Sequence, residues 1–440
     1  MLRALERHYA RELVVIGVHS AKFPTERQGP GLRLALRRLR ISHPVVNDPT
    51  FRLWRAYAVR AWPTLIFIDP EGRVIGRHEG EIPQPVLDRL LAEMVREFSA
   101  RGLLRPEPLP WQQAQEERLG GLMAFPGKVL ADAAADRLYI ADTGHHRIII
   151  ARLDGQVLQI VGQGEPGWLD GPAATCRFQS PEGLALGEGG LFIADTENHL
   201  IRRLDLASGI VTTVAGTGEQ ALRWSAGGPA RQTPLSSPWD LAWHQGALYI
   251  AMAGLHQLWR LEPDGLTLTA WAGTGGEGLR DGHRTEAWFA QPSGLAVAGD
   301  RLYVADSESS AIREVDLASG QVRTIVGTGL FDFGDVDGVG EAARLQHPLG
   351  VTAVHDLLYV ADTYNHKIKR LSPRTRMVMT VAGSGEPGRD DGTGLAARFF
   401  EPGGLSAAAG ALYIADTNNH AIRRLDLATA RVTTVAVRLP

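Results

Sequence analysis

Histidine and aspartate recur at fixed positions along this chain of 440 residues, and they are the side chains best suited to chemistry. A histidine occupies the same place in five of six repeated segments, and Ser310 replaces it in the fourth; the five are His146, His199, His256, His366 and His420. Imidazole and carboxylate groups are common zinc ligands. When repeats close into a ring, however, equivalent positions are spread around that ring and lie too far apart to bind one ion together. We therefore predict that each histidine hydrogen-bonds its own turn.

The aspartates end a repeated Leu-Tyr-Ile-Ala-Asp segment, and Met252 takes their place in the third repeat. The five are Asp142, Asp195, Asp306, Asp362 and Asp416. An aspartate beside threonine or serine is typical of a turn in which the carboxylate bonds the backbone. We interpret these residues as structural. Because the third repeat also lacks the Asn-His pair, we expect it to carry a specific departure, such as a contact surface.

Three further sets of side chains have a chemical interpretation. Cys176 is the only cysteine, and we expect it to be a small buried residue. Acidic side chains in two long loops offer the oxygen ligands that calcium prefers, although without the dense spacing of a calcium loop; they are Asp335, Asp337, Asp390 and Asp391. Basic pairs such as Arg202–Arg203 and Arg423–Arg424 suit a nucleic acid, but neighbouring strand residues point to opposite sides, so we expect solvated or salt-bridged faces. We predict no catalytic residue, no metal and no cofactor.

Six prolines mark a second column of the repeat, and each precedes a strand of small and aliphatic residues. They are Pro126, Pro181, Pro238, Pro292, Pro348 and Pro402. Each repeat continues with the Leu-Tyr-Ile-Ala-Asp strand, a turn and two more strands, at a nearly constant period. Four antiparallel strands repeated six times predict a six-bladed β-propeller over residues 125–440. The first and last repeats each contain all four strands of a blade. We therefore expect little or no strand exchange between repeats where the ring closes.

The first hundred residues alternate strand and helix and end in a hairpin and a helix. Residues 14–18 and 65–68 are the clearest strands, and residues 28–40 and 85–98 the clearest helices. The segment Trp62-Pro63-Thr64, followed by Asp-Pro-Glu-Gly, resembles the thioredoxin fold. The resemblance implies an α/β domain over residues 1–102, in which the bond before Pro63 is cis and faces a redox site.

Two features of the thioredoxin fold are absent from the sequence. They are the central strand that starts the fold and the Cys-x-x-Cys motif whose thiolates perform dithiol–disulfide chemistry. The domain is therefore predicted to be redox-inactive as written. The absent strand would lie between residues 14–18 and 65–68, and its removal would leave backbone groups unpaired. We interpret residues 1–102 as the remainder of a longer domain; the alternative is a degenerate domain that pairs its strands differently.

Composition limits the possible partners and cellular settings of the protein and indicates how its two domains are joined. The net charge of −3 offers no general attraction for nucleic acid. No apolar run approaches the length of a membrane span, and a single cysteine fits a reducing, cytoplasmic setting. Alternating prolines within residues 103–124 predict an extended linker.

The turns Asn198-His199-Leu200, Asn365-His366-Lys367 and Asn419-His420-Ala421 resemble the signature of NHL repeats, and the resemblance covers residues 127–437. It implies a propeller that serves as an interaction platform, here joined to a thioredoxin-like domain. We expect a monomer whose long-loop face binds a protein partner, and neither RNA nor a membrane. Two alternatives remain open. A thiol–disulfide oxidoreductase requires a Cys-x-x-Cys segment upstream of Met1, and a propeller-based metal-dependent lyase or hydrolase requires a polar cluster at the central channel.

Overall fold

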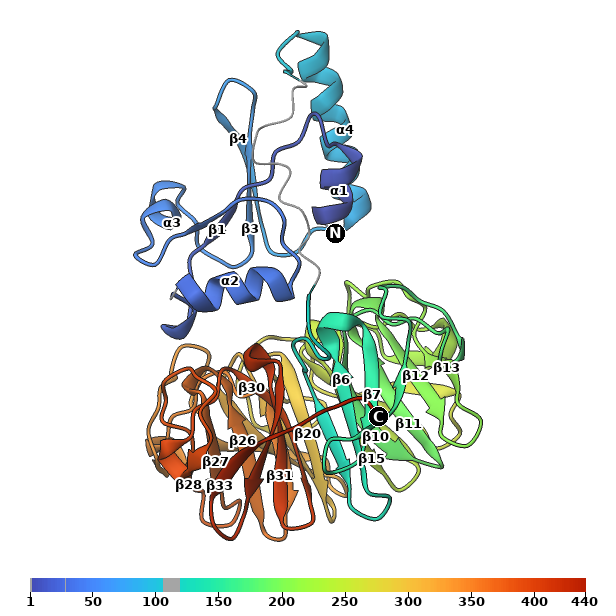
Figure 1. The fold of residues 1–440 in the computed structure, drawn as a ribbon. Helices are drawn as coiled ribbons and strands as arrows, with labels where there is room; N and C mark the ends of the chain where they lie inside the picture. Colours follow the sequence, from blue (N-terminus) through green and yellow to red (C-terminus); the bar gives the residue numbers. More distant parts are fainter. Residues whose placement is uncertain (1, 28, 106–118) are drawn as a thin grey trace. The chain divides into compact units, whose positions relative to one another are not determined.

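The computed structural model describes residues 2–27, 29–105 and 119–440. The chain divides into two compact units, Met1–Arg118 and Leu119–Pro440, which run from blue to red in Figure 1. Most of the predicted linker, residues 106–118, lies outside the described residues. None of the helices in the described ranges has both the length and the apolar character that a bilayer crossing requires.

The first unit is built from helices and strands, with four α-helices, one short 3-10 helix (Thr25–Arg27) and four strands among its described residues. In chain order the α-helices and strands are α1 (Leu2–His8), β1 (Gly17–His19), α2 (Gly29–Arg38), β2 (Val45–Asn47), α3 (Arg52–Ala56), β3 (Thr64–Ile68), β4 (Val74–Glu79) and α4 (Gln84–Ala100). Leu5 and Tyr9, in and just after α1, and Leu87 and Leu91 of α4 form a small core that Leu65 of β3 contacts. The predicted alternation of strands and helices is therefore present.

The strands of this unit form two separate two-stranded sheets. β1 pairs in parallel with β2, and β3 pairs antiparallel with β4, but β1 and β3 do not pair with each other. Apolar side chains on and beside these strands stay exposed, among them Ile16 at 56 % and Ile68 at 47 %. The described residues of this unit therefore form no sheet that joins β1 to β3.

The second unit is a six-bladed propeller, and each blade is one antiparallel sheet. The innermost strands are β5 (Val129–Asp132), β10 (Pro181–Gly187), β15 (Pro238–His244), β20 (Pro292–Ala298), β25 (Gly350–Val354) and β30 (Pro402–Ala408). The second strands are β6 (Arg137–Asp142), β11 (Gly190–Asp195), β16 (Ala247–Met252), β21 (Arg301–Asp306), β26 (Leu357–Asp362) and β31 (Ala411–Asp416). Both sets follow the predicted columns of proline and aspartate.

Two further strands complete each blade towards the outside. The third strands are β7 (Arg147–Ala151), β12 (Leu200–Asp205), β17 (Gln257–Leu261), β22 (Ala311–Asp316), β27 (Lys367–Leu371) and β32 (Ala421–Asp426). The fourth strands are β8 (Val157–Val161), β13 (Ile210–Ala215), β18 (Thr267–Ala272), β23 (Gln321–Val326), β28 (Met377–Ala382) and β33 (Arg431–Val435).

A short fifth strand from the long loop covers the outer edge of blades 2 to 6. These strands are β9 (Gly171–Pro172), β14 (Gly227–Pro229), β19 (Gly282–His283), β24 (Gly338–Val339) and β29 (Gly392–Thr393). They pair with the fourth strand of the same blade, so they satisfy backbone groups that an open edge would expose. Strand order shows that every blade is built from consecutive residues, which confirms the prediction that strands are not exchanged.

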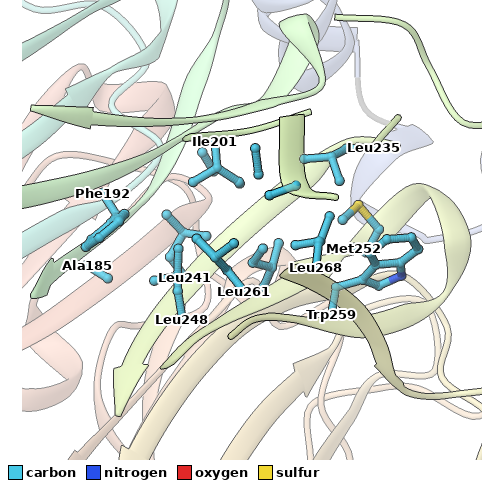
Figure 2. Close-up of a cluster of buried hydrophobic side chains, with 14 of the residues drawn as sticks. Ala185, Phe192, Ile201, Leu235, Leu241, Leu248, Met252, Trp259, Leu261 and Leu268 are labelled. Atoms are coloured by element: carbon cyan, nitrogen blue, oxygen red, sulfur yellow. The ribbon is translucent and has the colours of Figure 1, made fainter. Parts of the chain in front are cut away.

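The apolar cores lie between neighbouring blades. The second strands are almost completely buried because both of their faces pack against other blades. One core combines Ala185 and Phe192 of blade 2 with Leu241 and Leu248 of blade 3 (Figure 2). Another combines Ile140 of blade 1 with Tyr413 and Ile422 of blade 6. A single blade buries little by itself, so the ring must close before most of this surface leaves water.

The outer edge of blade 1 is covered differently, by the end of the chain. Arg438 forms a parallel bridge with Gln156, and its carbonyl accepts a hydrogen bond of 2.9 Å from the Val157 N–H. Its guanidinium also donates to Asp154 at 3.0 Å. Gly155 permits this approach, because a Cβ there would lie 2.4 Å from the Ala436 carbonyl oxygen. The expected simple closure thus gains one short contact between the C-terminal segment and blade 1.

Removal of residues 436–440 should destabilise the propeller by about 1–3 kcal/mol, because it leaves the β8 edge unpaired and removes a surface ion pair. Thermal unfolding followed by circular dichroism measures the change in midpoint. Removal of Leu439 and Pro440 alone is the matched control and should have no effect, since it keeps Arg438. Equal midpoints for the longer deletion and the control would contradict a closing role for this segment.

Candidate functional site: the repeated turns and the central channel

The repeated aspartates lie fully buried at the end of the second strand in five blades. In each case Oδ1 accepts a hydrogen bond from a backbone N–H of the loop that leads into the same blade. In blade 2, for example, the Gln179 N–H donates to Asp195 at 2.7 Å, and the other four bonds measure 2.7 or 2.8 Å. The aspartates therefore hold the connecting loops in place.

A buried cation on the third strand joins four of these carboxylates to the long loop, whereas Asp142 of blade 1 pairs with the partly exposed Arg147 at 2.8 Å. Arg202 of blade 2 is 0 % exposed and donates to Asp195 at 2.8 Å and to Asp170 at 2.6 Å. Asp170 also accepts hydrogen bonds from the N–H and hydroxyl of Thr213 in β13. Burial raises the pKa of Asp195 to about 6 although Arg202 opposes the shift. Arg313 and Arg423 repeat the arrangement in blades 4 and 6.

Blade 5 uses lysine in place of arginine. Lys369 lies 2.7 Å from Asp335, 3.1 Å from Asp337 and 3.6 Å from Asp362. The candidate calcium ligands are thus engaged with cations of the chain itself: Asp391 binds Arg423 at 2.9 Å, and Asp390 lies 3.5 Å from Arg398. Within residues 2–27, 29–105 and 119–440, no group of three or more histidine, cysteine or acidic side chains is placed to hold a metal ion.

The histidines bind the next blade, and the prediction that each bonds its own turn is wrong. Each His Nδ1 accepts the backbone N–H of the residue that precedes the column proline of the following blade, at distances of 2.9 to 3.2 Å. In blade 4 the Ser310 hydroxyl accepts the equivalent bond from His347. The histidines take left-handed backbone angles after the turn, which directs them across the blade boundary. The sixth bond, from Phe125 to His420, closes the ring.

A hydroxyl beside each aspartate forms a second bond across the same boundary. Thr143, Thr196 and Thr363 donate to the carbonyl of the column proline in the following blade at 2.7 or 2.8 Å. Ser307 does the same, and Thr417 of blade 6 donates to Pro126 of blade 1 at 2.9 Å. Together with the histidine bonds, these contacts form an inter-blade latch.

Blade 3 departs from the pattern inside its core rather than at its surface. Met252 and Trp259 replace the aspartate and the buried cation, and both are 0 % exposed (Figure 2). Gly227 and Ala270 stand where other blades have the loop aspartate and its threonine partner. The Met252 sulfur takes over as acceptor for the loop, with the Ser236 N–H at 3.3 Å. All parts of the ion cluster are replaced together, so no charge is left buried without a partner.

The structure reveals a polar pair in the central channel that the sequence analysis missed. Lys128 of blade 1 reaches across the channel to Asp240 of blade 3 at 3.2 Å and to the carbonyl oxygens of Ser293 and Leu349 at 2.7 and 2.6 Å. Asp240 also accepts the N–H groups of Leu241 and Leu295. Burial raises the pKa of Asp240, and Lys128 opposes this shift. The pair thus ties blade 1 to blades 3, 4 and 5.

This pair lines a cavity of about 290 Å³ along the channel. The rest of the lining is mainly aliphatic and comes from the innermost strands of all six blades, with Trp243, Thr352 and Ser406 among the exceptions. All three ammonium protons of Lys128 have acceptors at hydrogen-bond distance. The pair is therefore suited to holding blades together, because neither charge is left over for proton transfer to a ligand.

A sequence signal for this pair does exist. Lys128 and Asp240 occupy the second position after the column proline, where the other four repeats have glycine: Gly183, Gly294, Gly350 and Gly404. These glycines let neighbouring innermost strands approach, since a Cβ at Gly183 would lie 2.4 Å from the Asp240 Cα. Two opposite charges that interrupt a column of glycines indicate contact across the ring.

Other candidate residues lie apart from these contacts. Cys176 is buried, as predicted, and burial raises the pKa of its thiol to about 11. In the first unit the Trp62–Pro63 bond is cis, and Thr64 begins β3. The Trp62 indole donates to the Ser20 carbonyl at 2.8 Å and lies 4.4 Å from the Trp54 ring, so it forms part of a half-exposed aromatic cluster.

Replacement of Lys128 with methionine should destabilise the propeller by about 3–5 kcal/mol, because it leaves Asp240 buried without a counterion. Denaturant unfolding of the full chain measures the loss. The double variant Lys128→Met/Asp240→Asn is the control, since asparagine still offers an acceptor for the backbone N–H groups without a charge. It should be more stable than the single variant. A single variant as stable as the unmodified chain would rule out the proposed tie.

Acid should weaken the latches, because a protonated Nδ1 cannot accept a hydrogen bond. Burial lowers the pKa of His199 from 6.5 to about 4. The unfolded chain therefore binds more protons between these values, and stability is lost as the pH falls through this window. The variant His199→Ser copies Ser310 and has no imidazole to protonate at this position. Between pH 7 and pH 5, its free energy of unfolding should fall by about 2 kcal/mol less than that of the unmodified chain. Unfolding free energies at both pH values test this, and identical losses would contradict it.

Comparison with known proteins agrees with this architecture. The NHL repeat family model matches residues 178–204 and 289–314, which belong to blades 2 and 4. NHL repeat-containing protein 2 of Bos taurus is 41 % identical over 472 residues, which cover 99 % of this chain and 65 % of that protein. Protein SUPPRESSOR OF QUENCHING 1, chloroplastic, of Arabidopsis thaliana is 40 % identical over 447 residues, which cover 97 % of this chain and 42 % of that protein.

Some solved structures resemble this chain at low sequence identity. A catalytically inactive virginiamycin B lyase from Staphylococcus aureus shares 13 % identity with a TM-score of 0.45, over 73 % of this chain and 87 % of that one. A likeness at this level carries no functional conclusion. The sequence relationship is much stronger, although the chain spans only about 65 % of the length of NHL repeat-containing protein 2. The chain thus carries NHL repeats in blades 2 and 4 and is similar over almost its whole length to NHL repeat-containing protein 2.

Proposed function

We propose that this chain is an interaction scaffold whose propeller binds a protein partner through the face that carries the long loops. The proposal rests on the observation that the repeated polar side chains are engaged in contacts within the propeller. Aspartates, cations, histidines and hydroxyls are engaged in buried ion clusters and in inter-blade latches, and the channel pair is satisfied internally. The long loops remain as the variable, solvent-facing part, and ordered loops on a rigid scaffold commonly carry binding.

For the first unit we propose a thioredoxin-like α/β domain that acts as an adaptor. Its order of helices and strands and its parallel and antiparallel strand pairs support this assignment. The sequence contains one cysteine, Cys176, which lies in the propeller. As written, the domain therefore has no thiol pair for disulfide exchange.

The two enzymatic alternatives have less support. An oxidoreductase requires a dithiol that this sequence does not contain, and Cys176 is buried with a raised pKa, which disfavours the reactive thiolate. A lyase or hydrolase requires an acid or base with access to substrate. The charged pair in the channel is held in contacts with backbone and with itself. Binding to RNA is disfavoured because Arg202 and Arg423 are buried in ion pairs.

Oligomeric state, cellular location and cofactor use belong to the same proposal. We infer a monomeric chain that acts in the cytoplasm without a cofactor. The lone, buried cysteine and the net charge of −3 are the observations that support this setting.

The loop face should be the site of partner contact, and site-specific cross-linking tests this directly. Phe331 in a long loop and Leu266 in a turn between a third and a fourth strand are both 73 % exposed, and they lie on opposite faces. A photoreactive phenylalanine at position 331 of the full chain, expressed in its native cell, should give a discrete adduct. The same group at position 266 is the matched control and should give none. Adducts from position 266 alone, or from neither position, would overturn the proposal.

A further inference from the structure

Three tryptophans on successive long loops form an exposed aromatic strip. Trp168, Trp224 and Trp288 lie in the loops that lead into blades 2, 3 and 4, and they are 46 %, 62 % and 38 % exposed. The corresponding loops of blades 5 and 6 contain no tryptophan, so the blade fold does not require one. Large aromatic side chains that a fold leaves in water commonly mark interaction surfaces. We call these three residues the tryptophan strip.

Each ring of the tryptophan strip lies close to a glycine of a long loop. A Cβ at Gly218 would lie 2.6 Å from Cζ3 of Trp168, so that ring rests on the start of the next loop. A Cβ at Gly275 would lie 3.7 Å from Cδ1 of Trp224, and one at Gly276 would lie 3.1 Å from Cε2 of Trp288. Trp224 and Trp288 therefore each lie close to one of two consecutive glycines.

The three tryptophans differ in the hydrogen bonds of their indole N–H groups. The Trp168 indole donates to the Thr213 hydroxyl at 3.0 Å, which fixes that ring against β13. Across the described residues, the indole N–H groups of Trp224 and Trp288 have no protein acceptor. Two flat apolar rings with free donors suit a ligand that stacks and offers carbonyl oxygens.

Charge and strand pairing restrict the kind of ligand further. Arg223 is next to Trp224 in sequence, and the Arg280 guanidinium lies 5.9 Å from the Trp288 ring centre. Neither arginine has a carboxylate partner within the described ranges. An added β-strand is disfavoured, because β9, β14 and β19 already cover the outer edges of these three blades. An extended proline-rich segment needs no strand edge, presents its carbonyl groups outward and packs proline rings on aromatic side chains.

We propose that the tryptophan strip binds an acidic, proline-rich segment of a partner protein in the polyproline II conformation. The rings of Trp224 and Trp288 pack against proline, their indole N–H groups donate to peptide carbonyl groups, and Arg223 and Arg280 pair with acidic side chains. Trp168 supports the strip from blade 2. This inference rests on the proposed scaffold function and assigns the chemistry of its partner.

Calorimetric titration of the full chain with a synthetic peptide of repeated Pro-Glu-Pro-Pro sequence tests the proposal. We expect Trp224→Ala and Trp288→Ala each to weaken binding about tenfold or more, as for buried aromatic anchors. Leu266→Ala, an equally conspicuous apolar side chain on the opposite face, is the matched control and should leave affinity unchanged. Replacing glutamate by lysine in the peptide should abolish binding if the arginines contribute as described.

Three outcomes would overturn the inference. One is no detectable heat with millimolar peptide, and another is equal affinity for the tryptophan variants and the unmodified chain. The third is concentration-dependent self-association in sedimentation that Trp224→Ala abolishes, since a second copy would then occupy the strip. A partner adduct at position 331 that persists in any of these cases would leave the scaffold function standing and reject only the assigned ligand.

Discussion

Closure of the ring between blade 6 and blade 1 is the constraint on which the rest of the propeller depends. The apolar cores lie between blades, so each blade keeps an exposed face until its neighbour is in place. The chain places bonds across this seam in two places. His420 and Thr417 bind residues before β5, and Arg438 covers the outer edge of β8. Lys128 adds a tie across the channel from blade 1 to blades 3, 4 and 5. Of these contacts, only those of His420 and Thr417 repeat in the other blades.

The packing between blades also explains how blade 3 can lack the buried charges that other blades contain. An ion cluster is tolerated inside a propeller only when every carboxylate and every cation has its partner, because an isolated buried charge is costly. Loss of one member alone would therefore be destabilising. In blade 3 the changes to Met252, Trp259, Gly227 and Ala270 occur together, and the result is an apolar core with the loop still anchored. The cluster behaves as one exchangeable unit.

The repeat made most of the propeller predictable, because period and alternation both report local structure. Strand positions, the aspartate column and the blade count follow from residues within one repeat. Contacts between blades do not, since a residue's partner in the next blade depends on how the sheets stack. The histidine bonds were therefore assigned to the wrong partner, since the donor is a backbone N–H of the next blade, and the Lys128–Asp240 pair was overlooked despite the glycine column. The contact of Arg438 with blade 1 had no local signal.

The repeated polar residues are engaged in holding the blades together, so under the proposed scaffold function the specificity for a partner comes from residues that do not repeat. Substitution of a latch histidine or a cluster arginine would affect stability first, so these columns have little freedom to encode a partner. The long loops are different, since they are anchored at the aspartate column and at the fifth strand while the segment between varies. Their tryptophans occur in three adjacent blades and rest on glycines of the following or the same loop. A binding surface can therefore change there without disturbing the seams that hold the ring.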